Sequence, residues 1–347
     1  MKNAKRRTTA QDVAQFAGTS QSAVSRVFTP GASVSTELRK RILKAANELG
    51  YRPNAFARSL ITRRSGMVAV TMAMMHNPYN AKLIEVLTSR LQDQGYQVLL
   101  FSAPHGSSAS LLLEQIMQYQ VEAVILGSTG LSPLQTSECQ LAGVPIIMFN
   151  PSLEDTGISM VLGENERAGE MIGDFLVKGG HKRMAFVSGH EGTVGSHHRE
   201  VGFTRAVVNA GLPEPIRVNG DYDIHTTAKV MRDLLNRRDR PDAVFCANDS
   251  TAITCLDVAR YEFGLKVPDD ISIVGFDDMP QSRLPGFDLT TYAQPVTPFV
   301  DLTIGIVNDF VRDPSQAPRR ITVAGEFLIR GTARIPDGMT RRPKENL

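Results

Sequence analysis

From Gly66 onward, short apolar runs alternate with longer amphipathic stretches, and this rhythm restricts the fold of most of the chain. The runs are rich in β-branched residues, and several of the stretches between them end at glycine. Strands that alternate with helices predict parallel sheets with helices on both faces. The predicted strands span 67–72, 96–102, 121–127, 144–150, 184–189, 216–220, 243–248 and 272–278, and the predicted helices 79–94, 108–119, 132–142, 165–178, 198–210, 225–236 and 249–263.

The rhythm runs through two series of strands, so we expect an α/β body of two doubly wound lobes with a cleft between them. Ligands of such sheets bind beyond the carboxyl ends of the strands. Asn248 and Asp249 follow one predicted strand, Asp277 closes another, and Arg199 is expected to open the helix after a third. An amide, a carboxylate and a guanidinium facing one cleft suit a small polyhydroxylated ligand.

Each of these residues also has a purely structural interpretation. Asn248 or Asp249 can serve only as a helix N-cap, which is compatible with binding. Asp277 and Asp278 can form a turn. Arg199 can belong to a surface ion pair near Glu200.

The N-terminal part of the chain follows a different pattern, of three short helices joined by tight turns. Thr9 and Asp12 fit a capping box at the start of the first helix, and Gly18 ends it. Ser20 can cap the second. Two helices joined by a tight glycine turn and braced by a third describe a helix-turn-helix. The predicted helices span about 10–17, 21–28 and 36–49.

The second of these helices has two distinct sides. Its apolar side, which pins the helix to its neighbours, consists of Ala23, Val24 and Val27. Its polar side, which is rich in hydrogen-bond donors, consists of Gln21, Ser22, Ser25 and Arg26. A polar side of this kind suits the reading of base edges in the major groove. The alternative is a small three-helix bundle that docks to another protein.

Charge favours DNA over a protein partner. Residues 1–66 carry 13 basic and 3 acidic side chains, a net charge of +10. The whole chain carries +2, so the remainder carries −8. Basic charge confined to the helix-turn-helix is the electrostatic footprint of a phosphate binder.

The segments DVAQFAGTSQSAVSRVF, VST and ANELGYRPNAFARSL resemble the headpiece of the LacI/GalR (lactose repressor) family of bacterial transcription regulators. The likeness continues in GGHKRMAFVSG, NDSTA, VPDDISIVGFDD and LTTYAQP. It implies a sequence-specific DNA-binding regulator with a periplasmic-binding-protein-like body. It also implies that Gln21, Ser22 and Arg26 contact base edges, while Thr9 and Ser20 hold phosphates.

The segment Asn54–Ile61 resembles the hinge helix of the family. Eight residues are too few for a stable isolated helix in water, so we expect folding on DNA. By the resemblance, Asn54 belongs to the DNA-contacting set and Leu60 wedges into the minor groove and kinks the duplex. The alternative is that Leu60 packs only on its own domain.

Within the body, the resemblance places Arg199, Asn248 and Asp277 at effector-contacting positions, with Tyr79 as a stacking surface in the other lobe. It implies a repressor whose operator affinity depends on a sugar-like effector. A corepressor-dependent or dual regulator responding to a nucleobase or phosphorylated metabolite stays open. The sequence departs from the family at Glu164, where many members have aspartate.

The resulting domain assignment is a DNA-binding domain over 1–53, a hinge over 54–65 and an effector-binding and dimerisation domain over 66–337. Within it, the resemblance implies lobe boundaries near 162, 291 and 322. The N-lobe then spans 66–162 and 292–321, and the C-lobe 163–291 and 322–337, with a tail over 338–347. No heptads follow Pro336, so we expect a homodimer on a pseudo-palindromic double-stranded operator.

Several classes of protein find no support. The chain contains no P-loop, no HExxH, no GxSxG and no GxGxxG after its first strand, so we expect neither an enzyme nor a cofactor. A cytosolic binding protein or enzyme with an incidental basic segment is the alternative of another class. His190, His197 and His198 match no standard zinc spacing. We expect a cytoplasmic protein for three reasons. The three cysteines form no CxxC motif, the N-terminus has no apolar signal segment, and no apolar run is long enough to span a membrane.

Overall fold

The computed structural model describes residues 8–29, 31–52, 64–102, 109–127, 143–149 and 157–342. The chain divides into two compact units, Met1–Ser65 and Gly66–Leu347, here called the headpiece unit and the body. The predicted hinge segment Asn54–Ile61, the predicted helix over 132–142 and the last five residues of the tail lie outside the described residues.

The headpiece unit contains the three predicted helices, α1 (Ala10–Phe16), α2 (Gln21–Val27) and α3 (Thr36–Glu48). The predicted capping box is confirmed, because the Thr9 amide donates to Asp12 Oδ2 at 2.7 Å and Thr9 Oγ1 accepts from the Asp12 amide. All three helices turn apolar residues into one small core, which includes Val13, Val24 and Ile42. That shared core fixes α2 by its apolar side.

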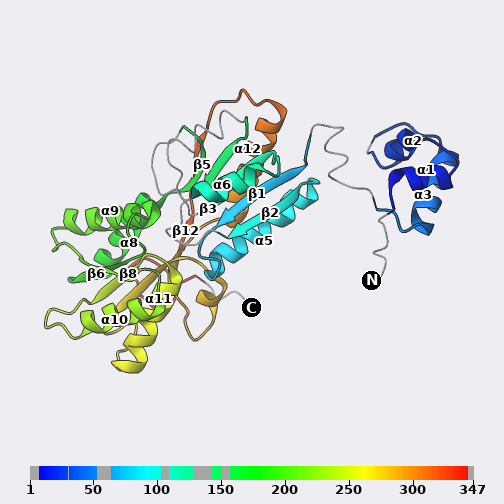
Figure 1. The fold of residues 1–347 in the computed structure, drawn as a ribbon. Helices are drawn as coiled ribbons and strands as arrows, with labels where there is room; N and C mark the ends of the chain where they lie inside the picture. Colours follow the sequence, from blue (N-terminus) through cyan, green and yellow to red (C-terminus); the bar gives the residue numbers. More distant parts are fainter. Residues whose placement is uncertain are drawn as a thin grey trace. The chain divides into compact units, whose positions relative to one another are not determined.

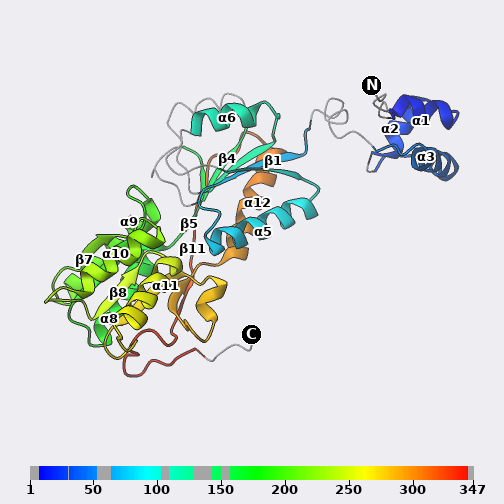
Figure 2. The same ribbon diagram turned by 60° about the horizontal axis from the view of Figure 1, so that its bottom comes forward.

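The N-lobe of the body is a parallel sheet of six strands in the order β2-β1-β3-β4-β5-β11. Helices α5 (Pro78–Asp93) and α12 (Val296–Arg312) cover one face, and α6 (Ala109–Met117) lies on the other (Figure 2). The strands are β1 (Met67–Met72), β2 (Gln97–Ser102), β3 (Ala123–Gly127), β4 (Ile146–Phe149), β5 (Ser159–Gly163) and β11 (Arg320–Val323).

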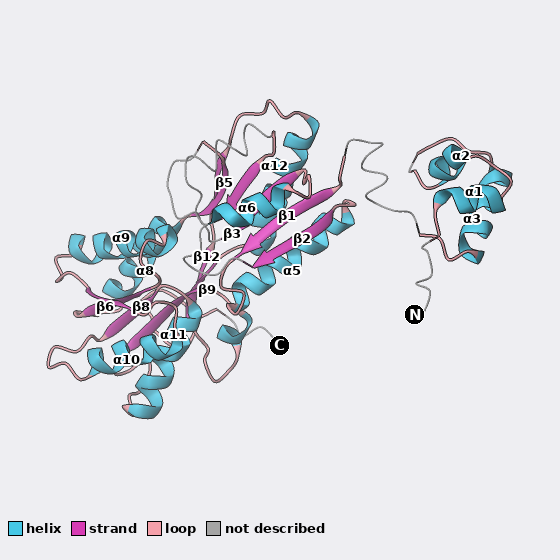
Figure 3. Ribbon diagram, viewed as in Figure 1, coloured by secondary structure: helices cyan, strands magenta, loops and turns pink. Residues whose placement is uncertain are grey.

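The C-lobe repeats this arrangement in the order β7-β6-β8-β9-β10-β12, with only β12 antiparallel. Helices α8 (Asn165–Lys178) and α9 (Val194–Asn209) pack on one face, while α10 (Ile224–Leu235) and α11 (Asp249–Asp257) pack on the other (Figures 1 and 3). The strands are β6 (Met184–Ser188), β7 (Ile216–Asn219), β8 (Ala243–Cys246), β9 (Ser272–Asp277), β10 (Thr290–Ala293) and β12 (Glu326–Leu328). A π-helical turn spans Val258–Glu262 and a 3-10 helix spans Pro280–Arg283.

The chain passes between the lobes three times. The first crossover, Gly163–Asn165, joins β5 to α8, and the second, Gln294–Pro295, joins β10 to α12. The third, Ala324–Gly325, joins β11 to β12. Each lobe is therefore assembled from separate stretches of sequence, and the crossovers lie between them.

The body departs from the sequence-based expectation in two respects. The predicted start of the helix containing Arg199 was wrong, because α9 begins earlier, at Val194. The first turn of α9 is polar, contains Gly195 and has no apolar stripe, so the sequence pattern did not indicate it. Arg199 therefore lies in the second turn rather than at the helix start. The patterns also missed α12 and four strands of three to five residues, β5, β10, β11 and β12.

Two simpler observations complete the fold. Cys246 and Cys255 are buried free thiols, and Cys139 lies outside the described residues. Across the described part of the chain, no helix combines the length and the apolar character needed to cross a membrane.

Candidate functional site

Helix α2 presents the polar side that its sequence predicts. Its apolar residues are buried in the headpiece core. The residues exposed on the opposite side are Gln21, Ser22, Ser25 and Arg26. Thr9 and Ser20 stand at the starts of α1 and α2, where Ser20 Oγ accepts a hydrogen bond from the Ala23 amide at 3.2 Å. Both hydroxyls thus serve as helix caps. Asn54 and Leu60, the two predicted hinge contacts, lie outside the described residues.

In the body, polar side chains from both lobes converge where strands end. Tyr79, near the start of α5, comes from the N-lobe. Arg199, Asn248 and Asp277 come from the C-lobe, and all four side chains are at least nine-tenths buried. The charges of Arg199 and Asp277 both act on the Tyr79 hydroxyl, so these three residues of the two lobes lie near one another. Asn248 is the chain neighbour of Ala247, whose carbonyl accepts from Arg199. Burial first, and the Asp277 carboxylate second, raise the pKa of Tyr79.

Arg199 is held rigidly inside the C-lobe. Its Nε donates to Asn165 Oδ1 at 2.8 Å and its Nη1 donates to the Ala247 carbonyl. The guanidinium carbon lies 3.5 Å from the centre of the Phe276 ring, a cation–π contact. The alternative of a surface ion pair is wrong, because Arg199 is only 5% exposed and it is Arg217 that pairs with Glu200.

Asp277 is a buried carboxylate in an unusual backbone conformation. Its φ of 115° is costly for a residue other than glycine, and such strain gathers at functional sites. Its Oδ1 accepts from Gln294 Nε2 at 2.7 Å. Burial raises the pKa of Asp277 to about 6, against the opposing effect of Arg199. The carboxylate is therefore mostly ionised at neutral pH and can accept hydrogen bonds from hydroxyl groups. The neighbouring Asp278 instead pairs with Arg330 and Arg283.

Asn248 and Asp249 stand at the start of α11 and have different hydrogen-bond partners. Asn248 Oδ1 caps the helix by accepting a hydrogen bond from the Thr251 amide at 2.9 Å. Asp249 is used inside the lobe, where three hydrogen bonds reach its two oxygens. The capping interpretation is therefore confirmed for Asn248, and capping does not exclude binding.

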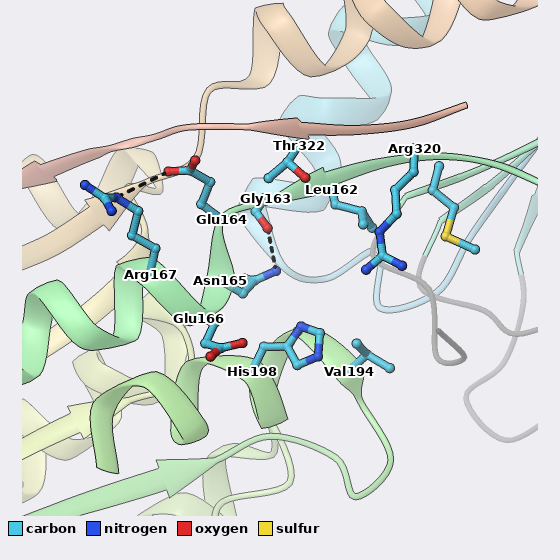
Figure 4. A pocket seen from close by; sticks show the side chains of 12 residues that line it. Leu162, Gly163, Glu164, Asn165, Glu166, Arg167, Val194, His198, Arg320 and Thr322 are labelled. Atoms are coloured by element: carbon cyan, nitrogen blue, oxygen red, sulfur yellow. Dashed lines mark hydrogen bonds and ion pairs between the residues drawn. The ribbon is translucent and has the colours of Figure 1, made fainter. Parts of the chain in front are cut away.

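Beside this cluster, the first crossover borders a pocket of about 270 Å³. Figure 4 shows Glu164 turned toward Arg167, at 4.0 Å, and Asn165 turned toward Gly163. His198 and Arg320 line the hollow from α9 and β11. Glu164, the departure from the family pattern, makes no side-chain cap for α8.

The chain is similar to known proteins in sequence and in structure. A family profile described as bacterial regulatory proteins, lacI family, matches residues 9–54, and one for a periplasmic binding protein-like domain matches residues 174–333. Catabolite control protein A of Priestia megaterium is 31% identical over 293 residues, which cover 83% of this chain and 88% of the relative.

The chain belongs to the LacI family. Its fold also matches a crystal structure of the Lac repressor dimer bound to operator and the anti-inducer ONPF, with a TM-score of 0.85 at 22% identity over 94% of this chain and 99% of that chain. A complex of the transcriptional regulator CelR with cellobiose gives a TM-score of 0.71 at 26% identity over 94% and 100%. This LacI-family member is thus a DNA-binding transcriptional regulator and not an enzyme.

The predicted site of this LacI-family protein omitted three amide side chains. Asn77 caps α5 through a bond from the Tyr79 amide and also lowers the pKa of Asp277 by hydrogen bonding. Asn165 contacts Arg199, and Gln294 contacts Asp277. Asn165 and Gln294 belong to crossovers, so strand-end reasoning did not find them.

The three histidines noted in the sequence lie near one another in the body, since His190 and His197 line one pocket and the ring centres of His197 and His198 are 6.2 Å apart. His190 Nδ1 lies 2.5 Å from Asp221 Oδ1, and its ring meets Tyr222 edge-on with centres 5.5 Å apart. His198 lines the pocket of Figure 4, and His197 lines a second pocket with Arg217. Among the residues that the structure describes, no group of three or more histidine, cysteine or acidic side chains is arranged to hold a metal ion.

Proposed function

We propose that this protein is a repressor whose operator affinity is set by a small sugar-like effector bound between the lobes. The observation that carries the proposal is the convergence of Tyr79, Arg199 and Asp277, which come from two lobes and are buried together. The complex of CelR with cellobiose supports a sugar as the ligand class.

The four predicted effector contacts have complementary chemistry. Asp277 accepts hydrogen bonds from ligand hydroxyls, and Asn248 donates through its amide nitrogen. Arg199 offers the guanidinium nitrogen that Asn165 and Ala247 do not use. Tyr79 supplies a flat apolar surface for a sugar ring. A ligand that meets groups from both lobes stabilises the arrangement in which those groups are close.

DNA recognition belongs to the first 65 residues. Gln21, Ser22 and Arg26 read base edges, and Thr9 and Ser20 meet phosphates as well as capping their helices. Asn54 and Leu60 act in a hinge that folds in the minor groove. The corresponding domains are 1–53 for DNA, 54–65 for the hinge, 66–337 for the effector and dimerisation, and 338–347 for a tail.

The active form is a homodimer on a pseudo-palindromic operator in the cytoplasm, where bacterial DNA lies. The operator-bound Lac repressor dimer, which shares the fold, supports this arrangement. An effector that changes how the two bodies face each other changes whether both hinges can fold in one groove. An inducer favours the spacing that melts the hinges, whereas a corepressor favours the spacing that folds them.

The deciding experiment is a thermal-shift screen of sugars, sugar acids, sugar phosphates and purines against the wild type and Arg199→Ala. A ligand at a hundred times its Kd adds about 2.7 kcal/mol of stability. We expect a hit that Arg199→Ala loses, and an operator titration with that hit then gives the sign. A hit retained in Arg199→Ala would show that the ligand binds elsewhere.

A further inference from the structure

Arg199 and Asp277, the two charged residues among the proposed effector contacts, are bonded to amide side chains that belong to crossovers. Arg199 Nε donates to Asn165 Oδ1 in the first crossover at 2.8 Å. Asp277 Oδ1 accepts from Gln294 Nε2 in the second crossover at 2.7 Å. Both amides are buried, with 5% and 6% of their surface exposed. Any movement of either charged group therefore displaces a segment that joins the lobes.

Asn165 has a second bond, and this bond leads out of the C-lobe. Its Nδ2 donates to the carbonyl of Gly163 at 3.3 Å, as the dashed line in Figure 4 shows. Gly163 is the last residue of β5 and thus belongs to the N-lobe sheet. One amide therefore bridges Arg199 of the C-lobe and the end of an N-lobe strand.

The two crossovers also come close to each other at Gly163. A Cβ atom at this position would lie 3.0 Å from Gln294 Oε1 and 3.7 Å from Asn165 Nδ2. A shift of Gly163 in this direction would therefore meet Gln294, the amide that holds Asp277. The two charged groups, the two amides and the end of β5 form one contiguous network.

Helix packing makes the C-lobe end of this network rigid. A Cβ atom at Gly202 of α9 would lie 1.8 Å from the Glu166 carbonyl of α8, and one at Gly169 of α8 would lie 2.1 Å from the Arg199 carbonyl. The two helix backbones are thus in direct contact beside Asn165 and Arg199. Movement of α9 therefore carries the start of α8 with it.

We propose that Asn165 is a positioning residue that couples effector binding to the crossover. Its oxygen orients Arg199 toward the effector. Its amide nitrogen is bonded to the Gly163 carbonyl, so a displacement of Arg199 on effector binding also displaces Gly163 and the N-lobe sheet. This inference rests on the proposed effector-controlled function. It assigns the two ends of a single side chain to two separable tasks, binding and response.

The separation can be tested with two substitutions in the full-length protein. Asn165→Ala removes both bonds. Asn165→Asp keeps an oxygen for Arg199 but places a second oxygen opposite the Gly163 carbonyl, where no hydrogen bond is possible. Asn308→Asp serves as a matched control, because this α12 side chain bonds only Gln94 and Tyr96 among the described residues.

Sugar affinity is measured by calorimetry with ribose, glucose and cellobiose. Operator affinity is measured by fluorescence anisotropy with and without sugar, on a duplex that the wild type selects from a random pool. Asn165→Ala should weaken sugar binding by about tenfold or more. Asn165→Asp should keep most of that affinity while the ratio of operator affinities with and without sugar falls toward one. The control should keep the wild-type ratio.

An Asn165→Asp variant with the full wild-type ratio would overturn the coupling role and leave the proposed function standing. A wild-type ratio of one with every sugar that binds would instead overturn the proposed sugar response. A ligand-free measurement separates the two cases. Hydrogen exchange over residues 159–168 should accelerate in Asn165→Asp relative to Asn308→Asp, and unchanged exchange would refute the bridge to Gly163.

Discussion

At the scale of single residues, Asp249 and Asp277 are two buried carboxylates of the C-lobe with different surroundings. Asp249 accepts from the Met279 amide at 2.9 Å and from the hydroxyls of Ser282 and Thr291, both at 2.6 Å. All three donors belong to its own lobe. Asp277 is bonded instead to Gln294 of a crossover. Asp249 is therefore a structural group, whereas Asp277 is the carboxylate that we propose as an effector contact.

Replacement of Asp277 tests its role as an acceptor. Asp277→Asn should weaken effector binding by about ten- to a hundredfold, because a hydrogen bond to a charged acceptor is lost. Since the pKa of Asp277 is raised to about 6, wild-type affinity should fall as the pH drops through 6 and the acceptor is protonated. The measurement is calorimetry at pH 5 and 7.5. Equal pH dependence in Asp277→Asn and wild type would contradict this assignment.

Asp249 should give the body a stability that decreases with rising pH. Burial raises the pKa of Asp249 to about 7 in the folded protein, well above its value in an unfolded chain. The folded state therefore binds more protons between about pH 4 and 7, and the free energy of unfolding falls across that window. The loss is at most about 4 kcal/mol, from a shift of about three pKa units.

The check is urea unfolding at several pH values for the wild type and Asp249→Asn. Asparagine keeps the volume and an acceptor for the Met279 amide but does not ionise. The fall in stability from pH 4 to 7 should be smaller in the variant. An identical slope in both proteins would mean that Asp249 does not contribute to it.

At the scale of elements, the contact between α8 and α9 depends on glycine. Gly202→Ala should destabilise the body by about 3 kcal/mol or more, because the added Cβ meets the backbone of α8 and no side chain can move aside. Gly305→Ala in α12 is the matched control, since a Cβ there meets nothing within 4 Å. It should raise stability by up to about 1 kcal/mol.

Denaturant unfolding of the two alanine variants measures this difference directly. Because Arg199 lies next to the contact, Gly202→Ala should also weaken effector binding, whereas Gly305→Ala should not. Similar stability of the two variants would show that the helices separate at little cost. The packing would then not fix Arg199 relative to α8.

The elements divide clearly into those that the sequence predicts and those that it does not. Eight strands were recognisable from apolar runs that end at turn residues, as in MVAVTM and MAFVSG. β12 (Glu326–Leu328) has only three residues and so no local signal, and it forms through its pairing with a distant strand, which local patterns do not contain. α12, in contrast, has an amphipathic pattern, which Pro298 in its first turn obscures.

The candidate site shows the same limit. Asp277 and Asn248 follow recognisable strands, so their position at the sheet edge is readable from the sequence. Asn165 and Gln294 matter because of what they bond across the crossovers. Their partners are 34 and 17 residues away, and no spacing rule connects them. Tertiary structure was required to find them.

At the scale of the whole molecule, charge is divided between the parts of the chain. The first 66 residues carry +10 and the remainder −8. DNA binding should therefore weaken steeply with salt, by at least about a hundredfold between 50 and 200 mM, while sugar binding should respond little. Anisotropy and calorimetry at the two salt concentrations measure both. A shallow salt dependence of operator binding would contradict the assignment of phosphate contacts to the first 66 residues.

Sedimentation addresses the assembly of the same molecule. The protein should sediment as a dimer at micromolar concentration, and one dimer should bind one pseudo-palindromic duplex. A monomer both with and without operator would rule out the proposed arrangement. A single-half-site duplex is the control, because it should bind far more weakly than the full palindrome.

The three crossovers also set the order in which the molecule can be completed during synthesis. The three helices of the headpiece unit end at Glu48, so all of their core is available early. The N-lobe sheet, in contrast, needs β11 (Arg320–Val323), which leaves the ribosome after nearly every C-lobe element. A ribosome-bound chain therefore exposes an unfinished edge in each sheet, at β5 and at β10, until β11 and β12 have emerged. The DNA-binding end of a nascent chain is built well before the part that regulates it.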